Sequence, residues 1–284
     1  MPSELTTFYA QLKRGPALLF LGQDYLRLET GQDPFLSEIL RKYSATPVRG
    51  ENYFEVLDSR AGESAQTAAV WMEERCRRIP PPKWLKVVAS FPWNGICSSA
   101  FDSIWHAEFR NSWREVQPIL EEDHRPPDPR NRLLLHCTFL FGCVNRMEAG
   151  LRPPLKRSEW RNQRQIAIAF ARRLPELVTP IGILVVEGHA GDRDWYELND
   201  LLPVIGALGE NQTHLFSADQ ALRNNPEVAE LERDGKLVLH PESLFQVLSE
   251  GADLGHLQLA RGPPRRSAAR AAYSATRQDI VRSP

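Results

Sequence analysis

The sequence predicts an α/β protein with a doubly wound parallel sheet of about six strands and helices on both faces. Two observations predict this class. Short runs that are apolar throughout, such as 17–21 (ALLFL) and 181–186 (IGILVV), are typical of strands buried on both faces of a parallel sheet. Amphipathic helical patterns separate these runs, and strands that alternate with helices indicate a parallel sheet.

The first half of the chain is expected to begin with a helix and a buried strand. Residues 4–14 place Leu5, Phe8 and Leu12 on one helical face, and Pro16 ends that helix before the strand 17–21. Proline is favoured at the first helical position, so Asp33-Pro34 is expected to begin the next helix. Further elements expected in this half are helices at 61–79 and 100–109 and strands at 85–90, 116–120 and 133–135.

The second half continues the alternation and then loses it. A long amphipathic helix is expected at 158–174, followed by the strand 181–186. Further elements expected are helices at 195–208, 226–234 and 242–248 and strands at 213–216 and 236–239. From residue 251 the chain has little to bury. We therefore expect one domain over 1–250, with small insertions around 24–80 and 110–160, and a basic tail or linker over 251–284 rich in Pro, Arg and Ala.

Composition excludes several classes of protein. No apolar run approaches the ~20 residues that a membrane-spanning helix needs, and the N-terminus lacks the apolar core of a signal peptide. A cytoplasmic protein with no membrane partner is expected. The tail from Arg261 holds six arginines, which leaves the rest of the chain mildly acidic. A mildly acidic domain offers no basic surface for sequence-specific binding of nucleic acid.

The four cysteines indicate neither a zinc site nor a redox site. Cys76, Cys97, Cys137 and Cys143 contain no C-x-x-C pair, which zinc ribbons and thioredoxin-type sites require. Most of them lie in apolar stretches, so they are interpreted as small core residues. No metal is expected.

Two stretches carry the candidate catalytic residues. In 84–102 the expected strand leads into a Pro-Trp-Asn-Gly turn, and side chains at the carboxyl end of a strand are where open α/β sheets place ligands. Asn94 lies in that turn, with an amide that both donates and accepts hydrogen bonds. In 132–142 an apolar run ends in His136. A buried, hydrogen-bonded core histidine is the alternative interpretation of this residue.

Together, Asn94 and His136 resemble the active-site pair of the sirtuin-like NADases, bacterial immune relatives of the sirtuin deacetylases. In that family a strand ends in an Asn-bearing turn, commonly Thr-Thr-Asn-x-Asp, and a later strand ends in His, usually His-Gly. The resemblance covers about 17–248 and implies a Rossmann-like fold, here without a zinc module. Ile96 stands where the family carries Asp, and Cys137 where it carries Gly. Asp102 is interpreted as a carboxylate on a helix surface.

The same resemblance implies a binding site for NAD. The family's Gly-Ala-Gly-x-Ser loop corresponds to the stretch after the first strand, although a polar strand-to-helix turn is the alternative there. A glycine-led loop after strand 181–186 corresponds to the family's loop beside the NAD phosphate and ribose. The residues implied to bind NAD are Gly22, Gln23, Asp24, Gly188, His189, Asp192 and Ser217. Asp192 and Asp194 could accept hydrogen bonds from ribose hydroxyls, and capping of the helix that begins near Trp195 is the alternative role for both.

The resemblance implies hydrolysis of NAD to nicotinamide and ADP-ribose, as effector of a bacterial anti-phage defence system that works by abortive infection. His136 would deprotonate a ribose hydroxyl or the attacking water, which a neutral imidazole suits at pH 7. Asn94 would hold the ribose and the water. The alternative is a catalytically silent scaffold subunit that binds NAD or another nucleotide. A protein deacylase is a more distant third. NAD and either a homo-oligomer or a partner defence subunit are the expected partners.

Overall fold

Seven parallel strands form one sheet, in the order β3-β4-β2-β1-β5-β6-β7, so the predicted doubly wound, Rossmann-like class is confirmed with one strand more than expected. The structure is a computed structural model and describes residues 4–43, 63–110, 115–119, 134–146, 152–178, 182–191, 194–210 and 212–257. The strands are β1 Ala17–Leu21, β2 Gly95–Ser98, β3 Glu115–Ile119, β4 Leu134–Phe139, β5 Ile183–Glu187, β6 Thr213–Phe216 and β7 Leu237–His240.

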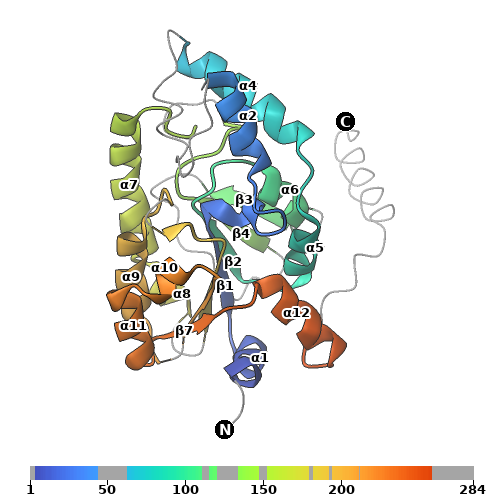
Figure 1. Cartoon of the computed structure of the whole chain (residues 1–284), viewed down its shortest axis with the longest axis vertical. Coiled ribbons are helices and arrows are strands. Elements are labelled where there is room, and N and C mark those ends of the chain that lie inside the picture. Colours follow the sequence, from blue (N-terminus) through green and yellow to red (C-terminus); the bar gives the residue numbers. More distant parts are fainter. Residues whose placement is uncertain are drawn as a thin grey trace, which may run out of the picture.

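Helices cover both faces of the sheet. Figure 1 shows α7, α9 and α11 along one side and α5, α6 and α12 along the other, with α1 at the end where β1 begins. The helices are α1 Glu4–Arg14, α2 Pro34–Tyr43, α4 Ala65–Arg78, α5 Lys83–Ser90, α6 Ile104–Arg110, α7 Arg157–Ala171, α8 Leu174–Val178, α9 Leu198–Gly206, α10 Gln220–Arg223, α11 Pro226–Arg233 and α12 Leu244–Asp253, with a 3-10 turn η1 at Gln23–Arg27.

β1 lies at the centre of the sheet and defines where a ligand is expected. The chain first moves from β1 towards β2, β4 and β3, and later extends from β5 to β7 on the other side of β1. The strand order therefore reverses between β1 and β5. In open α/β sheets, ligands bind outside the carboxyl ends of the strands at such a reversal. We call the end of the sheet where the strands finish the carboxyl edge, and the opposite end the amino edge.

Apolar strands form the core, as the sequence predicts. All five residues of β1 and all five of β5 are buried, which agrees with a strand covered on both faces. The four cysteines, expected to be core residues, are buried and unbridged. Within the described ranges no helix is long and apolar enough to cross a membrane.

The strand predicted at 85–90 is wrong, because this segment belongs to helix α5. Pro82 occupies the N-cap position, and the buried residues Trp84, Leu85, Val88 and Ala89 follow a helical spacing rather than an alternating one. A short apolar run cannot be assigned by composition alone. The strand of this region is β2, which begins after Asn94 rather than before it.

Other boundaries also differ from the prediction. β4 continues past His136 to Phe139, so the histidine lies inside the strand and not at its end. The helix expected at 100–109 begins only at Ile104, as α6. The carboxyl of Asp102 accepts a hydrogen bond from Ile104 N at 2.9 Å, and the residue is buried rather than on a helix surface. α12 ends at Asp253, three residues beyond the expected end of the domain, and residues 258–284 lie outside the described part.

Candidate functional site

Most residues predicted to bind NAD lie along the carboxyl edge. Gly22 and Gln23 follow β1, Gly188 and His189 follow the neighbouring β5, and Ser217 follows β6. The structure therefore brings these loops to one edge, as the sequence predicts for a parallel sheet. Asp192 lies outside the described residues.

The loops after β1 and β5 pack directly against each other. Gly22 N donates to Glu187 O at 2.8 Å, and Asp24 N donates to Gly188 O at 2.8 Å. A Cβ atom added to Gly22 would lie 2.4 Å from Gly188 O, a distance that no side chain tolerates. Because Gly22 has no side chain, the backbone of the loop after β5 can pack directly against it. Asp24, which the sequence places beside an anionic ligand, pairs with Arg27 at 3.3 Å.

Asp194, for which the sequence leaves open a ribose contact or a helix cap, connects these two loops. Its carboxylate accepts hydrogen bonds from Gln23 N at 2.9 Å, Ala190 N at 3.2 Å and Tyr196 N at 3.1 Å. The side chain is almost completely buried. Three backbone donors thus converge on one carboxylate, and charge-assisted hydrogen bonds of this kind are the strong ones. Asp194 holds the carboxyl edge together.

Both ring nitrogens of His189 are bound to backbone atoms. Nδ1 accepts from Gly191 N at 3.1 Å, so Nε2 carries the proton and donates to Tyr196 O at 2.9 Å. Ser217 has a comparable local role, because its hydroxyl oxygen accepts from Asp219 N at 3.1 Å. His189 and Ser217 are both predicted to bind NAD. The two ring nitrogens of His189 and the hydroxyl oxygen of Ser217 instead form hydrogen bonds to the backbone.

Glu187 ends β5 and caps a helix. Its carboxyl accepts from Leu244 N, at the start of α12, at 2.5 Å and from Gly188 N at 3.1 Å. Burial raises the pKa of Glu187 to about 8, and the hydrogen bonds from the two backbone amides oppose this shift. This carboxyl group is therefore mostly protonated at pH 7.

A tyrosine and an aspartate join the ends of β1 and β2. Tyr25 Oη donates to Asp102 Oδ1 at 2.5 Å and accepts from Trp105 N at 3.1 Å. Burial raises the pKa of Asp102 to about 7, while the hydrogen bonds from Tyr25 and Ile104 N lower it. Both side chains are buried among α6 and the strand ends. Asp102 is therefore bound to a phenol and a helix terminus.

An aromatic cluster of Phe101, Phe141 and Trp195 fills the space where β2, β4 and β5 end. Phe101 stacks on Trp195 with ring centroids 4.4 Å apart and planes 14° apart. Phe141 meets Trp195 edge-on, with centroids 5.7 Å apart. All three side chains are at most 1% exposed. Aromatic rings thus occupy the centre of the carboxyl edge.

Two polar atoms at this edge are buried without a hydrogen-bond partner in the described part of the chain. They are Gln23 Oε1, after β1, and Ser99 Oγ, after the adjacent β2. Buried polar atoms in native proteins are nearly always hydrogen-bonded, to protein or to ordered water. Each atom therefore offers a position for a water molecule.

Asn94 lies at the amino edge and not at the carboxyl edge. Its Oδ1 accepts from Ala17 N at 3.0 Å, and its backbone N donates to Ala17 O at 2.9 Å. Asn94 thus extends the pairing of β2 with the first residue of β1. β1 has five residues, and at about 3.3 Å per residue about 16 Å separate Ala17 from Gly22. The predicted catalytic amide and the predicted NAD loops lie at opposite ends of the strands.

His136 lies on the strand next to β2, opposite Gly95 in the register. It is therefore close to Asn94 along the sheet, as the predicted pair requires. The imidazole is half-buried and lines a cavity of about 10 Å³ together with Gly95, Thr138 and Phe170. Pockets that bind cofactor-sized ligands measure about 300–1,000 Å³. The cavity beside His136 has room for about one water molecule.

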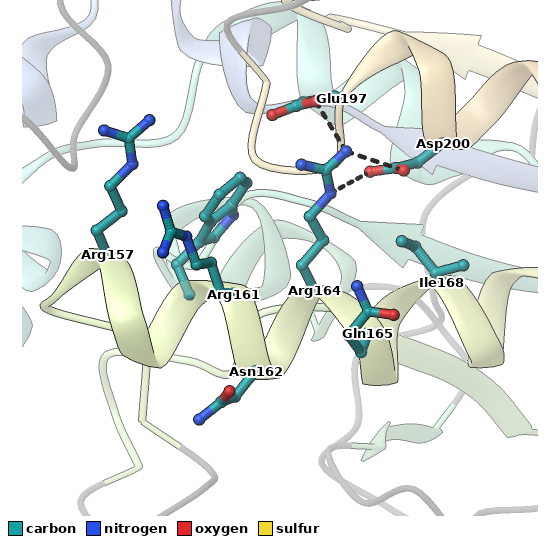
Figure 2. A pocket seen from close by; sticks show the side chains of 9 residues that line it. Arg157, Arg161, Asn162, Arg164, Gln165, Ile168, Glu197 and Asp200 are labelled. Atoms are coloured by element: carbon teal, nitrogen blue, oxygen red, sulfur yellow. Dashed lines mark hydrogen bonds and ion pairs between the residues drawn. The ribbon is translucent and has the colours of Figure 1, made fainter.

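A larger hollow lies on the outer surface of α7 and α9. It measures about 700 Å³ (Figure 2). Its lining includes three arginines of α7 and two acids, Glu197 just before α9 and Asp200 in the first turn of α9. These arginines are not among the residues that the sequence predicts for the site. The spacing Arg157, Arg161, Arg164 was the available signal, since residues at i, i+4 and i+7 share one helical face.

The described residues contain no group of three or more His, Cys, Asp or Glu side chains arranged to hold a metal ion. No protein-family model matches the chain, and no curated protein matches its sequence. The sirtuin-like resemblance therefore stays a prediction.

Proposed function

We propose that this chain is a catalytically silent scaffold module of a defence complex. This is the alternative to an NADase, but without the nucleotide binding that the alternative included. The acids and imidazole at its carboxyl edge support this proposal most directly. Asp102, Glu187, Asp194 and His189 each bind backbone amides, a backbone carbonyl or a phenol. A general base must reach the proton that it removes from substrate or water. The hydrogen bonds of these four groups therefore stabilise the fold.

The residues that follow the strands also support the proposal. β2 ends at Ser98, so the five residues at its carboxyl end are Ser98-Ser99-Ala100-Phe101-Asp102. This run is similar to the family motif Thr-Thr-Asn-x-Asp in its two hydroxyl residues and its final Asp. Ala100 then stands in the place of the catalytic Asn. An alanine has no group that holds a ribose or a water molecule.

A second replacement follows β4. Phe141-Gly142 comes just after the carboxyl end of this strand, where the family carries His-Gly. Aligned by these strand ends, the resemblance replaces both catalytic side chains with apolar ones. Phe141 also packs on Trp195, so its ring belongs to the core. Asn94, by contrast, is hydrogen-bonded to the backbone of Ala17, where β1 and β2 pair. His136 lies beside a cavity of only about 10 Å³.

The proposal is tested by incubating the purified full chain with NAD and measuring free nicotinamide. The same measurement is made with candidate partner subunits and phage components, since related enzymes are held inactive until triggered. We expect no release above the protein-free blank from the chain alone, and in the mixtures none that depends on Asn94 or His136. Nicotinamide release that His136→Ala or Asn94→Ala abolishes, in a variant that keeps its fold by circular dichroism, would contradict the proposal and restore the NADase hypothesis.

Release by the chain alone that neither variant affects would also contradict it. Such a result would place an active site on other residues. Ala100→Asn is the matched variant for the strand-end alignment, because it restores the motif without adding charge. We expect Ala100→Asn alone to remain inactive, since Phe141 still occupies the second catalytic position.

A further inference from the structure

A pocket of about 400 Å³ lies where α5 and α12 begin, and we call it the α5–α12 pocket. Figure 1 shows these two helices side by side, and they are in contact. The lining comes from their first turns and from the segment that follows η1, and it includes Leu28, Glu29, Lys83, Trp84, Phe245 and Gln246. The volume lies within the range of pockets that bind small molecules.

Three side chains give the pocket an apolar surface. Trp84 is 5% exposed, Phe245 is half-buried and Leu28 is 41% exposed. Aromatic rings present large apolar areas, and a ligand that covers them removes these areas from water. The part of a ligand that lies against these three side chains is therefore expected to be apolar.

The indole of Trp84 also has an unused hydrogen-bond donor. Trp84 Nε1 is buried and has no hydrogen-bond partner in the described part of the chain. Buried polar atoms in native proteins nearly always have a partner, and an indole nitrogen can only donate. An acceptor that the described residues do not supply is therefore expected beside Trp84.

Two opposite charges border the pocket without pairing with each other. Glu29 and Lys83 are the two charged residues of its lining, and both are exposed. Neither forms an ion pair within the described residues. A ligand that carries one positive and one negative group is complementary to this arrangement, whereas a ligand of high net charge is not.

The start of α5 adds to the positive side of the pocket. Lys83 is the first residue of α5, and Pro82 at the N-cap provides no side-chain hydrogen bond to the helix. The first amides of a helix have no intrahelical acceptor, and the helix dipole favours an anion there over a cation. The negative group of the ligand is therefore expected beside Lys83, and its positive group beside Glu29.

The α12 side of the pocket is fixed by hydrogen bonds within the chain. Ser243 N donates to Gln246 Oε1 at 3.2 Å, and Gln246 N donates to Ser243 Oγ at 3.4 Å. Glu187 accepts from Leu244 N at 2.5 Å. These bonds hold the first turn of α12, which carries Phe245. A wall that is already ordered lowers the entropic cost of binding a ligand.

We infer that the α5–α12 pocket binds a free α-amino acid with a large apolar side chain, of which phenylalanine and leucine are examples. The carboxylate pairs with Lys83 at the start of α5 and supplies the acceptor that Trp84 Nε1 lacks. The ammonium group pairs with Glu29, and the apolar side chain covers Trp84 and Phe245. None of these residues belongs to the loops predicted to bind NAD. The inference therefore goes beyond the proposed function and stands whether or not the chain hydrolyses NAD.

Isothermal titration calorimetry of the full chain at low ionic strength tests the inference. L-phenylalanine and L-leucine are titrated first, and we expect saturable binding of one equivalent of at least one of them. Glycine carries the same two charges without an apolar side chain, and we expect no binding. 3-Phenylpropionate lacks the ammonium group and L-phenylalaninamide lacks the carboxylate. Each is expected to bind about tenfold more weakly than L-phenylalanine, the loss of one charge-assisted contact.

Variants of the two charged residues assign the contacts. Lys83→Gln is expected to weaken the amino acid about tenfold. Lys86→Gln is the matched control, because Lys86 is exposed on the same helix and is not part of the lining. We expect this control to leave the affinity unchanged. Glu29→Gln is expected to weaken L-phenylalanine but not 3-phenylpropionate, which has no ammonium group.

Several outcomes would overturn the inference. They are no saturable binding of either amino acid, glycine binding as tightly as L-phenylalanine, or equal losses in Lys83→Gln and Lys86→Gln. 3-Phenylpropionate that binds as tightly as L-phenylalanine would overturn the role of Glu29 and indicate a site for apolar carboxylates. Self-association in sedimentation experiments that Phe245→Ser abolishes, with no amino acid bound, would instead show that a second copy of the chain covers the pocket.

Discussion

Charged side chains have different roles at the carboxyl edge and in the hollow on the outer surface of α7 and α9. At the carboxyl edge Asp194 is buried and accepts from three backbone amides. In the hollow Arg161 is exposed, and Arg164 is half-buried and pairs with Glu197 and Asp200. Polar residues at strand ends therefore need not form a ligand site, because the fold itself can use them.

The sequence predicted the fold better than the site because the two depend on different information. β1 and β6 match their predicted bounds, since a short apolar run between turns is sufficient to specify a buried parallel strand. The run at 85–90 fails because its apolar residues fit either a helix or a strand. Because of this one error, the sequence predicts Asn94 at the carboxyl edge, whereas the residue lies at the amino edge.

The roles of buried acids were beyond sequence reasoning for a physical reason. Asp102 and Asp194 each gain their role from a partner in another loop, Tyr25 and Gln23 respectively. Nothing local to either residue indicates that partner. For His136 the sequence does contain a local signal. Cys137 to Phe139 continue the mainly apolar run, so the strand extends past the histidine. The strand end therefore lies at Phe139.

Asp194→Ala is expected to give the largest effect on the carboxyl edge. Removing this buried carboxylate leaves three backbone donors without an acceptor, and we expect the free energy of unfolding to fall by about 3 kcal/mol. Urea denaturation measures the change. Asp219→Ala is the control, because Asp219 is exposed and caps only the short α10. A loss of about 1 kcal/mol is expected there. Equal losses in both variants would show that Asp194 does not hold the edge together.

Gly188→Ala sharpens the comparison by testing how closely the loops approach. Gly188 has φ +68°, and an added Cβ would lie 2.8 Å from backbone atoms of Tyr25. Gly31 has φ +71° but nothing within 4 Å of an added Cβ. Both variants incur similar backbone strain, so the difference between them isolates the clash. We expect Gly188→Ala to be less stable than Gly31→Ala by about 2 kcal/mol in urea denaturation. Matching stabilities would mean that the loops separate readily.

The pH dependence of stability separates the two acids that follow or end β2 and β5 from the two histidines of β6 and β7. Burial raises the pKa of Asp102 to about 7 and of Glu187 to about 8, so the folded state binds more protons than the unfolded state above pH ~4. Their contribution to stability is lost as pH rises through 7 and 8. Burial lowers the pKa of His214 to about 3 and of His240 to about 4. Their contribution is lost as pH falls below about 6.5.

Burial also lowers the pKa of His106 to about 4, so three histidines outweigh the two acids. The free energy of unfolding is therefore expected to rise between about pH 4.5 and 6.5 and to fall above pH 6.5. Each group contributes at most about 1.4 kcal/mol per pH unit. Glu187→Gln cannot titrate, so in this variant the decline between pH 6.5 and 8 should be shallower and the rise between pH 4.5 and 6.5 should be steeper. Parallel profiles for the variant and the original chain would show that Glu187 is already ionised in the folded protein.

A crystal structure of the full chain grown with NAD at millimolar concentration tests the account most directly. We expect Phe101 to remain stacked on Trp195, and the loops at Gly22 and Gly188 to remain hydrogen-bonded through Asp24 N, with no dinucleotide between them. A dinucleotide whose pyrophosphate lies against Gly22 and Gly188, with the aromatic cluster displaced, would contradict the account and make the carboxyl edge a binding site.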